Sequence, residues 1–211
     1  ARFGIDIWMT TNAITQNFKI CQANLGVKIH DAKDPAQHLA PMFRQVLWTI
    51  FTLMEQHENT WKDVQGSMPI ETFGFEGSVV PEPVQVDPNR LVSLFQTGFK
   101  QFSSFYREIF SPESFKVLQQ ASVLPPDRFF FETEAWARIL YELAATFHMW
   151  TVNRYKLIEV MTPLYYGRVA SFVHQSQDMS SEQAEALVEQ QAQEFENHKD
   201  YLIRVWDRKC N

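Results

Sequence analysis

Apolar side chains recur three or four positions apart over most of this chain, which is the spacing of one face of an α-helix. The stretches 39–54, 91–110 and 136–150 show this pattern, and it returns in the acidic stretch that ends near Trp206. A helix with such an apolar stripe buries it against other elements. The pattern therefore predicts a mostly α-helical fold.

Helix starts are marked by a short polar residue before proline or before an amphipathic run. Such a side chain accepts a hydrogen bond from a free N–H of the first turn, and proline suits the first helical position. The signals are Asp34-Pro35, Asp87-Pro88, Ser111-Pro112, Thr133 and Ser180, the last with Gln183 as a capping box. They predict helices over 35–56, 88–110, 112–121, from 133 onward and over 181–206. We expect Thr162-Pro163 to break or kink the helix from 133, and another helix to follow to about His174.

The N-terminal part predicts a helix over 7–18 and then a strand. Residues 19–29 alternate imperfectly between apolar and polar side chains, and Cys21 lies among them as a small buried hydrophobe. The stretch 57–63 should end the preceding helix. Glycine and proline then interrupt 65–88, where we expect a connecting loop with only short extended pieces. Such a loop either covers a ligand cleft or connects two sub-domains.

Composition narrows the class of protein. The chain has 211 residues, 45% hydrophobic residues and a formal net charge of −6, which fits a globular protein and argues against a nucleic-acid partner. No apolar run reaches the roughly 18–20 residues that span a bilayer. The 18 Phe, 6 Trp and 6 Tyr predict a large aromatic core. Two cysteines and no recognisable export signal lead us to expect a cytoplasmic protein, and the start at Ala1 a piece of a longer chain.

Asp6 and His30 are the first candidates for chemistry. Asp6 precedes the first predicted helix, and His30 stands at the end of the predicted strand. Residues before helices and at the ends of strands are common positions for ligand contacts, because the rigid elements hold their side chains in place. The alternative is an ordinary helix N-cap at Asp6 and an ordinary strand-end histidine, and spacing alone leaves both interpretations open. Trp8 and Met9 are interpreted as core residues.

Three motifs show a resemblance to a known family. They are Gly4-Ile5-Asp6-Ile7-Trp8-Met9-Thr10-Thr11, Leu25-Gly26-Val27-Lys28-Ile29-His30-Asp31 and Pro163-Leu164-Tyr165-Tyr166-Gly167-Arg168-Val169-Ala170-Ser171-Phe172. The chain resembles the C-terminal half of bacterial nucleotide-sugar glycosyltransferases similar to mannosylglycerate and glucosylglycerate synthases. The family's Asp-x-Asp metal motif is absent. The resemblance implies the end of an α/β catalytic domain of GT-A type over 1–64, a connecting loop over 65–88 and a helical C-terminal domain over 89–211.

The resemblance also implies roles for three residues. His30 would bind a divalent metal ion, Mn²⁺ or Mg²⁺, together with carboxylates from the rest of the enzyme. Asp6, the expected catalytic residue, would bind acceptor hydroxyls or organise the reacting sugar, and Thr10 would line the same pocket. The donor would be a nucleotide-diphosphate sugar, the acceptor a small polar molecule such as glycerate, and the transfer would retain anomeric configuration. This stretch alone is expected to be inactive.

Arg168 can hold a carboxylate or a phosphate of the substrates in a bidentate fork, or it pairs with a nearby acid. His38, His57, His148, His174 and His198 have no partner by spacing and are interpreted as surface or core residues. The acidic stretch 182–196 is interpreted as a solvated helix face. The alternative function is a helical interaction module without chemistry of its own, which forms a homodimer through the helical domain.

Overall fold

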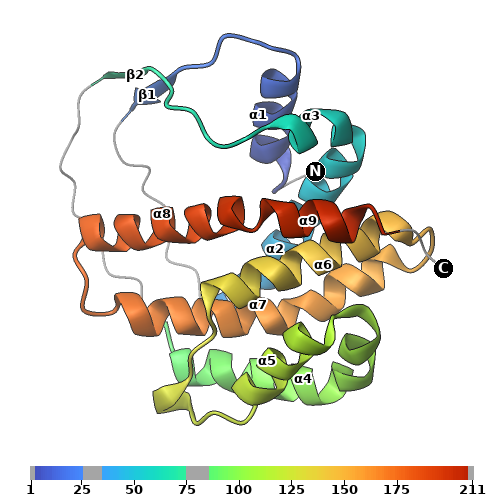
Figure 1. Ribbon diagram of the computed structural model, residues 1–211. Helices are drawn as coiled ribbons and strands as arrows, with labels where there is room; N and C mark the ends of the chain where they lie inside the picture. The colour runs from blue at the N-terminus through green and yellow to red at the C-terminus, as the bar shows by residue number, and fades with distance from the viewer. Residues whose placement is uncertain (1–2, 26–34, 75–85, 209–211) are drawn as a thin grey trace. The chain divides into compact units, whose positions relative to one another are not determined.

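The computed structural model describes residues 3–25, 35–74 and 86–208, and of residues 35–38 only the backbone. The described chain is mostly helical with two short strands, as the hydrophobic pattern predicts (Figure 1). It divides into two compact units, Ala1–Val86 and Asp87–Asn211.

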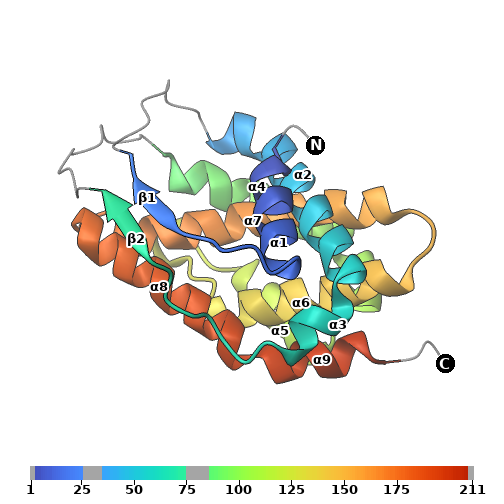
Figure 2. The same ribbon diagram turned by 90° about the horizontal axis from the view of Figure 1, so that it is seen from above.

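The first unit contains helices α1 (Ile5–Thr15), α2 (Pro35–Gln56) and α3 (Glu58–Asp63) and strands β1 (Gln22–Asn24) and β2 (Thr72–Gly74). The strands pair in parallel, with Ala23 opposite Phe73 (Figure 2). Two parallel strands cannot be joined by a tight turn, and here α2 and α3 lie between them in the sequence. All six strand residues are exposed.

Helix α1 packs on α2 through a close backbone contact. Gly4 precedes α1 and is buried, and a Cβ at this position would lie 2.0 Å from Oγ1 of Thr49. The backbone N–H of Phe3 donates to Oε1 of Gln45, 3.3 Å away. Glycine is therefore required where the chain enters α1.

Three expectations for the first unit are corrected. The first helix begins at Ile5 and ends at Thr15, because Asn17 takes the left-handed conformation, φ 58°, that asparagine tolerates. The strand is confined to Gln22–Asn24 among the described residues, and Cys21 is exposed and free rather than buried. Residues 57–63 do more than end the preceding helix, because Glu58–Asp63 form a helix of their own, α3. The predicted bounds of α2 are confirmed.

The second unit is a stack of helices. Its elements are α4 (Pro88–Ile109), α5 (Pro112–Ala121), the 3₁₀ turn η1 (Pro126–Arg128), α6 (Thr133–Met149), α7 (Arg154–Ser176), α8 (Ser181–Asn197) and α9 (Lys199–Trp206). Figure 1 shows α6 and α7 in a layer between α4 and α5 on one side and α8 and α9 on the other. The tightest packing is between α4 and α7 and between α6 and α9.

Aromatic side chains fill the core of the second unit, as the composition predicts. Phe95, Tyr106, Phe131 and Phe147 have no exposed surface. The rings of Phe95 and Phe131 lie 6.1 Å apart, and those of Phe99 and Tyr106 stack at 5.9 Å. Such ring pairs add to the stabilisation that burial alone provides.

Proline does not end α7 where the sequence suggests. The helix continues through Pro163, because Gly98 of α4 leaves room for the ring; a Cβ at Gly98 would lie 2.2 Å from Cβ of Pro163. The hydroxyl of Tyr106 donates to the carbonyl of Val160 one turn earlier, at 2.5 Å. The helical conformation is interrupted instead between α6 and α7, where Asn153 has φ 59°.

The predicted helix starts are largely confirmed. Asp87 accepts from the N–H of Arg90, Ser111 accepts from that of Ser114, and Ser180 forms the complete capping box with Gln183. The predicted cap at Thr133 is wrong, because Glu132 holds the N-cap position without a side-chain bond and Thr133 is the first helical residue. The predicted last helix is two helices, α8 and α9, which meet at His198.

No described helix combines the length and the apolar character that crossing a membrane requires.

Candidate functional site

Asp6 and Thr10 lie four residues apart on α1, and both side chains are exposed. This spacing brings two side chains to the same face of a helix. Asp6 is not the N-cap: Gly4 holds that position, and Asp6 is an acidic residue in the first turn, where the helix dipole favours a negative charge. The structure therefore presents a carboxylate and a hydroxyl side by side on an open helix face.

The apolar residues of α1 are not core residues. Trp8 is 49% exposed and Met9 59% exposed, and no residue of the helix is buried. The interpretation of Trp8 and Met9 as core residues is wrong for the described chain. The reason is that α1 contacts the rest of its unit mainly through α2, and one neighbouring helix cannot cover all faces of another.

The proposed metal ligand His30 lies outside the described residues. Within the described residues, no group of three or more His, Cys, Asp or Glu side chains could hold a metal ion.

Arg168, the fourth candidate, belongs to α7 in the second unit and is only 4% exposed. Its guanidinium donates to the carbonyl of Phe131 at 3.2 Å and to Oγ1 of Thr133 at 3.0 Å. Burial lowers its pKa from 12.5 to about 10, because desolvation penalises the charged form. The described partners of Arg168 are thus a carbonyl and a hydroxyl rather than an acid.

Ser171 holds the same segment from one turn further along α7. Its Oγ accepts from the backbone N–H of Phe131 at 3.1 Å and lies 3.3 Å from the carbonyl oxygen of the same residue. Arg168 and Ser171 together fix the chain that leads into α6. In this geometry the guanidinium positions Thr133 at the start of α6.

A polar groove opens in the second unit between α8, the start of α6 and the end of α7. We name it the α8 groove; its volume is about 460 Å³, and its polar lining includes Thr133, Glu134, Gln175, Gln190, Gln191 and Glu194. Oε1 of Gln175 is buried and has no hydrogen-bond partner among the described residues. Leu187 adds apolar surface.

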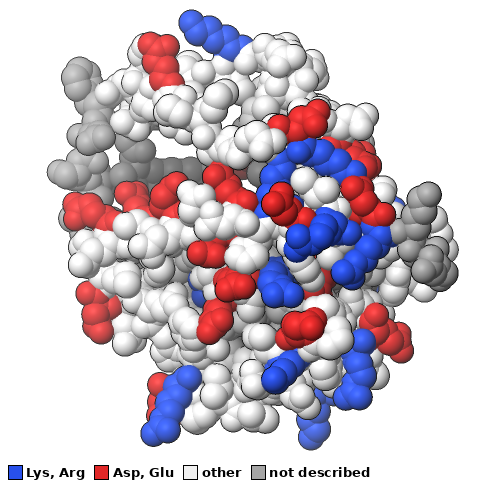
Figure 3. Space-filling model, in the orientation of Figure 1, with Lys and Arg blue, Asp and Glu red and all other residues white. Residues whose placement is uncertain are grey.

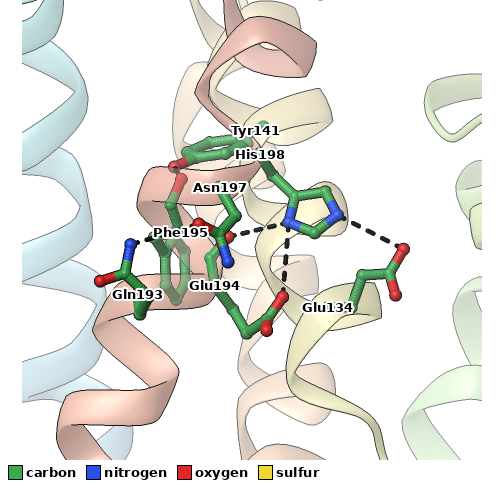
Figure 4. Close-up of polar contacts among 7 residues, drawn as sticks. All are labelled: Glu134, Tyr141, Gln193, Glu194, Phe195, Asn197 and His198. Atoms are coloured by element: carbon green, nitrogen blue, oxygen red, sulfur yellow. Dashed lines mark hydrogen bonds and ion pairs between the residues drawn. The ribbon is translucent and has the colours of Figure 1, made fainter. Parts of the chain in front are cut away.

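His198 lies at one end of the α8 groove, between two of its carboxylates (Figure 4). Its Nε2 is 3.3 Å from Oε1 of Glu134, and its Nδ1 is 3.6 Å from Oε2 of Glu194. Nδ1 also lies 2.8 Å from the backbone carbonyl oxygen of Glu194. Glu134 lies in the first turn of α6, and His198 joins α8 to α9. The contact between Glu134 and His198 therefore holds α6 next to the α8–α9 junction at that end of the groove.

Tyr141 and Glu142 provide two further attachments of α8 and α9. The Tyr141 hydroxyl donates to the carbonyl of Phe195 at 2.6 Å. Burial, and next the charge of Glu196, raise the pKa of Tyr141 to about 12. Glu142 is 6% exposed and accepts hydrogen bonds from Ser111, Ser114 and Tyr201, the last from α9.

The surface of α8 is acidic. The helix carries five glutamates and neither Lys nor Arg, and Figure 3 shows red side chains gathered along the strip that α8 occupies. None of its residues is buried, as the interpretation of a solvated face predicts. The expectation that His198 has no partner by spacing is wrong, because Glu194 lies one helical turn before it and contacts its Nδ1. Glu134 is too distant in the sequence for its contact with His198 to be predicted.

The roles expected of Asp6, Thr10, His30 and Arg168 rest on the sequence motifs alone. No protein-family model, no curated protein and no solved structure matches this chain.

Proposed function

We propose that the first unit is the end of the catalytic domain of a metal-dependent nucleotide-sugar glycosyltransferase, and that the second unit is its helical C-terminal domain. The sequence motifs around Asp6, His30 and Arg168 supply the reaction class. Two observations of the first unit carry the proposal: the exposed apolar residues of α1 and the exposed parallel strand pair. Both features are expected where an α/β domain continues beyond the described elements.

The apolar surface is concentrated on α1 and the segments near it. The exposed side chains include Ile5, Ile7, Trp8, Met9, Ile14 and Phe18. Many large apolar side chains exposed on one short segment indicate a surface that packs against another part of a protein. The proposed occupant is the nucleotide-binding half of the same catalytic domain, which the motif resemblance places before these residues.

The strand pair supports the same occupant. Parallel sheets are normally covered on both faces, and two strands alone are marginal in water. Every residue of β1 and β2 is exposed, and Phe73 is 51% exposed. Additional strands and helices from the remainder of an α/β domain would cover both.

In the complete enzyme, Asp6 and Thr10 would face the acceptor. A carboxylate accepts hydrogen bonds from sugar and glycerate hydroxyls, and the Thr10 hydroxyl both donates and accepts. His30 would contribute an imidazole to the metal site, with carboxylates from the remaining half. A divalent ion at such a site neutralises charge on the diphosphate leaving group.

The test uses the natural chain that carries this sequence, and calorimetry with UDP-glucose and GDP-mannose in the presence of Mn²⁺. We expect the natural chain to bind one of the two with metal dependence, and His30→Ala to weaken that binding at least tenfold. His57→Ala is the matched control, because Nε2 of His57 has no hydrogen-bond partner among the described residues. If the natural chain binds neither nucleotide-sugar, the proposal is wrong.

A helical interaction module is the second candidate, and the second unit favours it in one respect. This unit has its own aromatic core, whereas α8 buries none of its residues and leaves Val188 53% exposed. If the chain dimerises through α8, the substitution Val188→Glu should dissociate the dimer. Light scattering at micromolar concentration tests this, with Val123→Glu, at a 79% exposed position on a different segment, as control. A monomeric parent chain rules out this module.

A further inference from the structure

We propose that His198 is a pH-sensitive switch in the attachment of α8. Its charged ring holds the α8–α9 junction against the start of α6 in mildly acidic solution, and this contact weakens as the ring loses its charge above neutral pH. The residues involved all belong to the second unit. The inference therefore does not rest on the glycosyltransferase proposal, and either can fail without the other.

His198 is the residue at which α8 ends and α9 begins. It holds the C-cap position of α8 and the N-cap position of α9. Its backbone N–H donates to the carbonyl of Glu194 at 3.2 Å, and its own carbonyl accepts from the N–H of Tyr201 at 3.0 Å. A change in the contacts of this residue therefore acts on the ends of both helices.

Both ring nitrogens of His198 face hydrogen-bond acceptors (Figure 4). Nδ1 lies 2.8 Å from the backbone carbonyl oxygen of Glu194 and 3.6 Å from Oε2 of its carboxylate. Nε2 lies 3.3 Å from Oε1 of Glu134. A carbonyl and an ionised carboxylate have no hydrogen to donate, and a neutral imidazole has a single N–H, whereas the charged ring donates from both nitrogens. The contacts on both sides of the ring are therefore satisfied together only when His198 is charged.

The charges around this ring act in both directions. Glu134 of α6 and Glu194 of α8 contact its nitrogens and favour the charged form. Arg138 of α6 and Lys199 of α9 carry positive charge and oppose it. Because Arg138 follows Glu134 by one helical turn, it is the alternative partner for that carboxylate once the ring is neutral. Loss of the ring charge therefore releases Glu134 from the junction.

Two neighbouring groups do not change charge over the pH range in which histidine does. The Tyr141 hydroxyl donates to the carbonyl of Phe195, and burial raises the pKa of Tyr141 to about 12. Gln175, which α7 contributes to the α8 groove, is uncharged. Histidine changes charge between about pH 5 and 8, and carboxylates near pH 4. The contact should therefore be strongest at about pH 5–6 and weaken as pH rises toward 8.

Helix α8 is the element that this contact can release. None of its residues is buried, whereas α9 buries Leu202, Val205 and Trp206 and packs more tightly on α6. Segments with little buried apolar surface open locally without unfolding of the whole domain. Weakening the contact between His198 and Glu134 should therefore free α8 while α9 stays in place.

The experiment measures hydrogen exchange of the 211-residue chain by mass spectrometry between about pH 5.5 and 8. Rates are divided by the intrinsic amide exchange rate at each pH, and peptides of α4 and α7 serve as the internal reference. His198→Asn removes the titrating ring. Glu134→Gln removes one carboxylate partner, whose side chain is 56% exposed, and is the variant used if His198→Asn does not fold. Glu132→Gln makes the same change at an exposed position two residues earlier.

We expect the protection of α8 in the parent chain to fall about two- to fivefold over this range relative to α4 and α7, as for partly exposed ion pairs. His198→Asn should remove this dependence, Glu134→Gln should reduce it, and Glu132→Gln should keep it. The inference is overturned if α8 protection in the parent chain does not depend on pH, or if the two glutamate variants behave alike. A dependence that persists in His198→Asn also overturns it and would indicate His148, whose ring stacks on Trp206 at the other end of α9, 4.3 Å between centres.

Discussion

Tyr201 donates its hydroxyl hydrogen to the buried carboxylate of Glu142, and this bond ties α9 to α6. Ser111 and Ser114 donate to the same carboxylate from the N-terminal end of α5, at 2.7 and 2.8 Å through their hydroxyls. Glu142 thereby joins α5, α6 and α9. A carboxylate buried to this degree is tolerated only because its oxygens accept several bonds.

Removing either partner should destabilise the chain. We expect Tyr201→Phe to lower the free energy of unfolding by about 1.5–3 kcal/mol, the range for a hydrogen bond to a charged group. Glu142→Ala should cost more, because it also leaves the donors of Ser111 and Ser114 without an acceptor. Urea denaturation measures both, and Tyr155→Phe, at a 78% exposed position, should change stability by less than about 0.5 kcal/mol. Equal effects of the two tyrosine variants would contradict this prediction.

Alkaline pH should weaken the attachment of α8 through Tyr141. Its pKa is raised from 10.0 to about 12, so the folded state favours the neutral phenol. A group with a raised pKa in the folded state contributes stability that is fully present below pH 10 and is lost as pH rises toward 12. We expect Tyr141→Phe to show a shallower fall in stability over this window than the parent chain. Urea midpoints at successive pH values would show parallel curves if the expectation is wrong.

Gly98 should not tolerate a larger side chain. Gly98→Ala places a Cβ against Pro163, and neither helix backbone can move without separating α4 from α7. We expect a loss of about 1–3 kcal/mol in unfolding free energy, typical of overpacking, although alanine is the better helix former. Thr97→Ala, at the exposed neighbouring position, should be neutral or slightly stabilising. A stabilised Gly98→Ala variant would show that the helices can separate without cost.

Arg168 should contribute to stability in the absence of any ligand. Arg168→Ala removes the donors to Phe131 and Thr133 and leaves a buried carbonyl and hydroxyl without them. The carbonyl of Phe131 keeps the Ser171 hydroxyl as a donor, so we expect a loss of about 1–3 kcal/mol. The control is Arg128→Ala, whose side chain is 81% exposed and whose loss should matter little. If thermal unfolding of Arg168→Ala matches the parent chain, the arginine is free for a substrate, as the sequence motif suggests.

Local signals in the sequence were sufficient for most helix starts and insufficient for contacts between distant segments. Asp87, Ser111 and Ser180 cap helices as predicted, because capping depends on residues three positions away. Thr133 was misassigned because a residue 35 positions away, Arg168, determines its contacts. The path of α7 through Pro163 likewise depends on Gly98, which no local pattern indicates.

The candidate site shows the same limit. The exposure of Trp8 and of Cys21 depends on which elements pack around the first unit, and periodicity predicts only that an apolar face exists. His198 and Glu194 form an i, i+4 pair that can be recognised in the sequence. Glu134 completes the cluster from another helix, and Gln175 is identified only by its buried oxygen. Tertiary packing therefore decides where the α8 groove forms.

Helix α8 should depend on its cap more than the other helices of the second unit do, because each of those has buried residues and α8 has none. Ser180 accepts from the N–H of Gln183 at 3.3 Å, and the Gln183 side chain accepts from the N–H of Ser180 at 2.8 Å. Ser180→Ala should cost about 1 kcal/mol locally, which corresponds to about fivefold faster hydrogen exchange in the first turns of α8. Ser181→Ala, one position later, removes no cap and should leave exchange unchanged. Uniform acceleration across α4 and α7 as well would show that α8 opens only with the whole second unit, and would contradict the local role of the capping box.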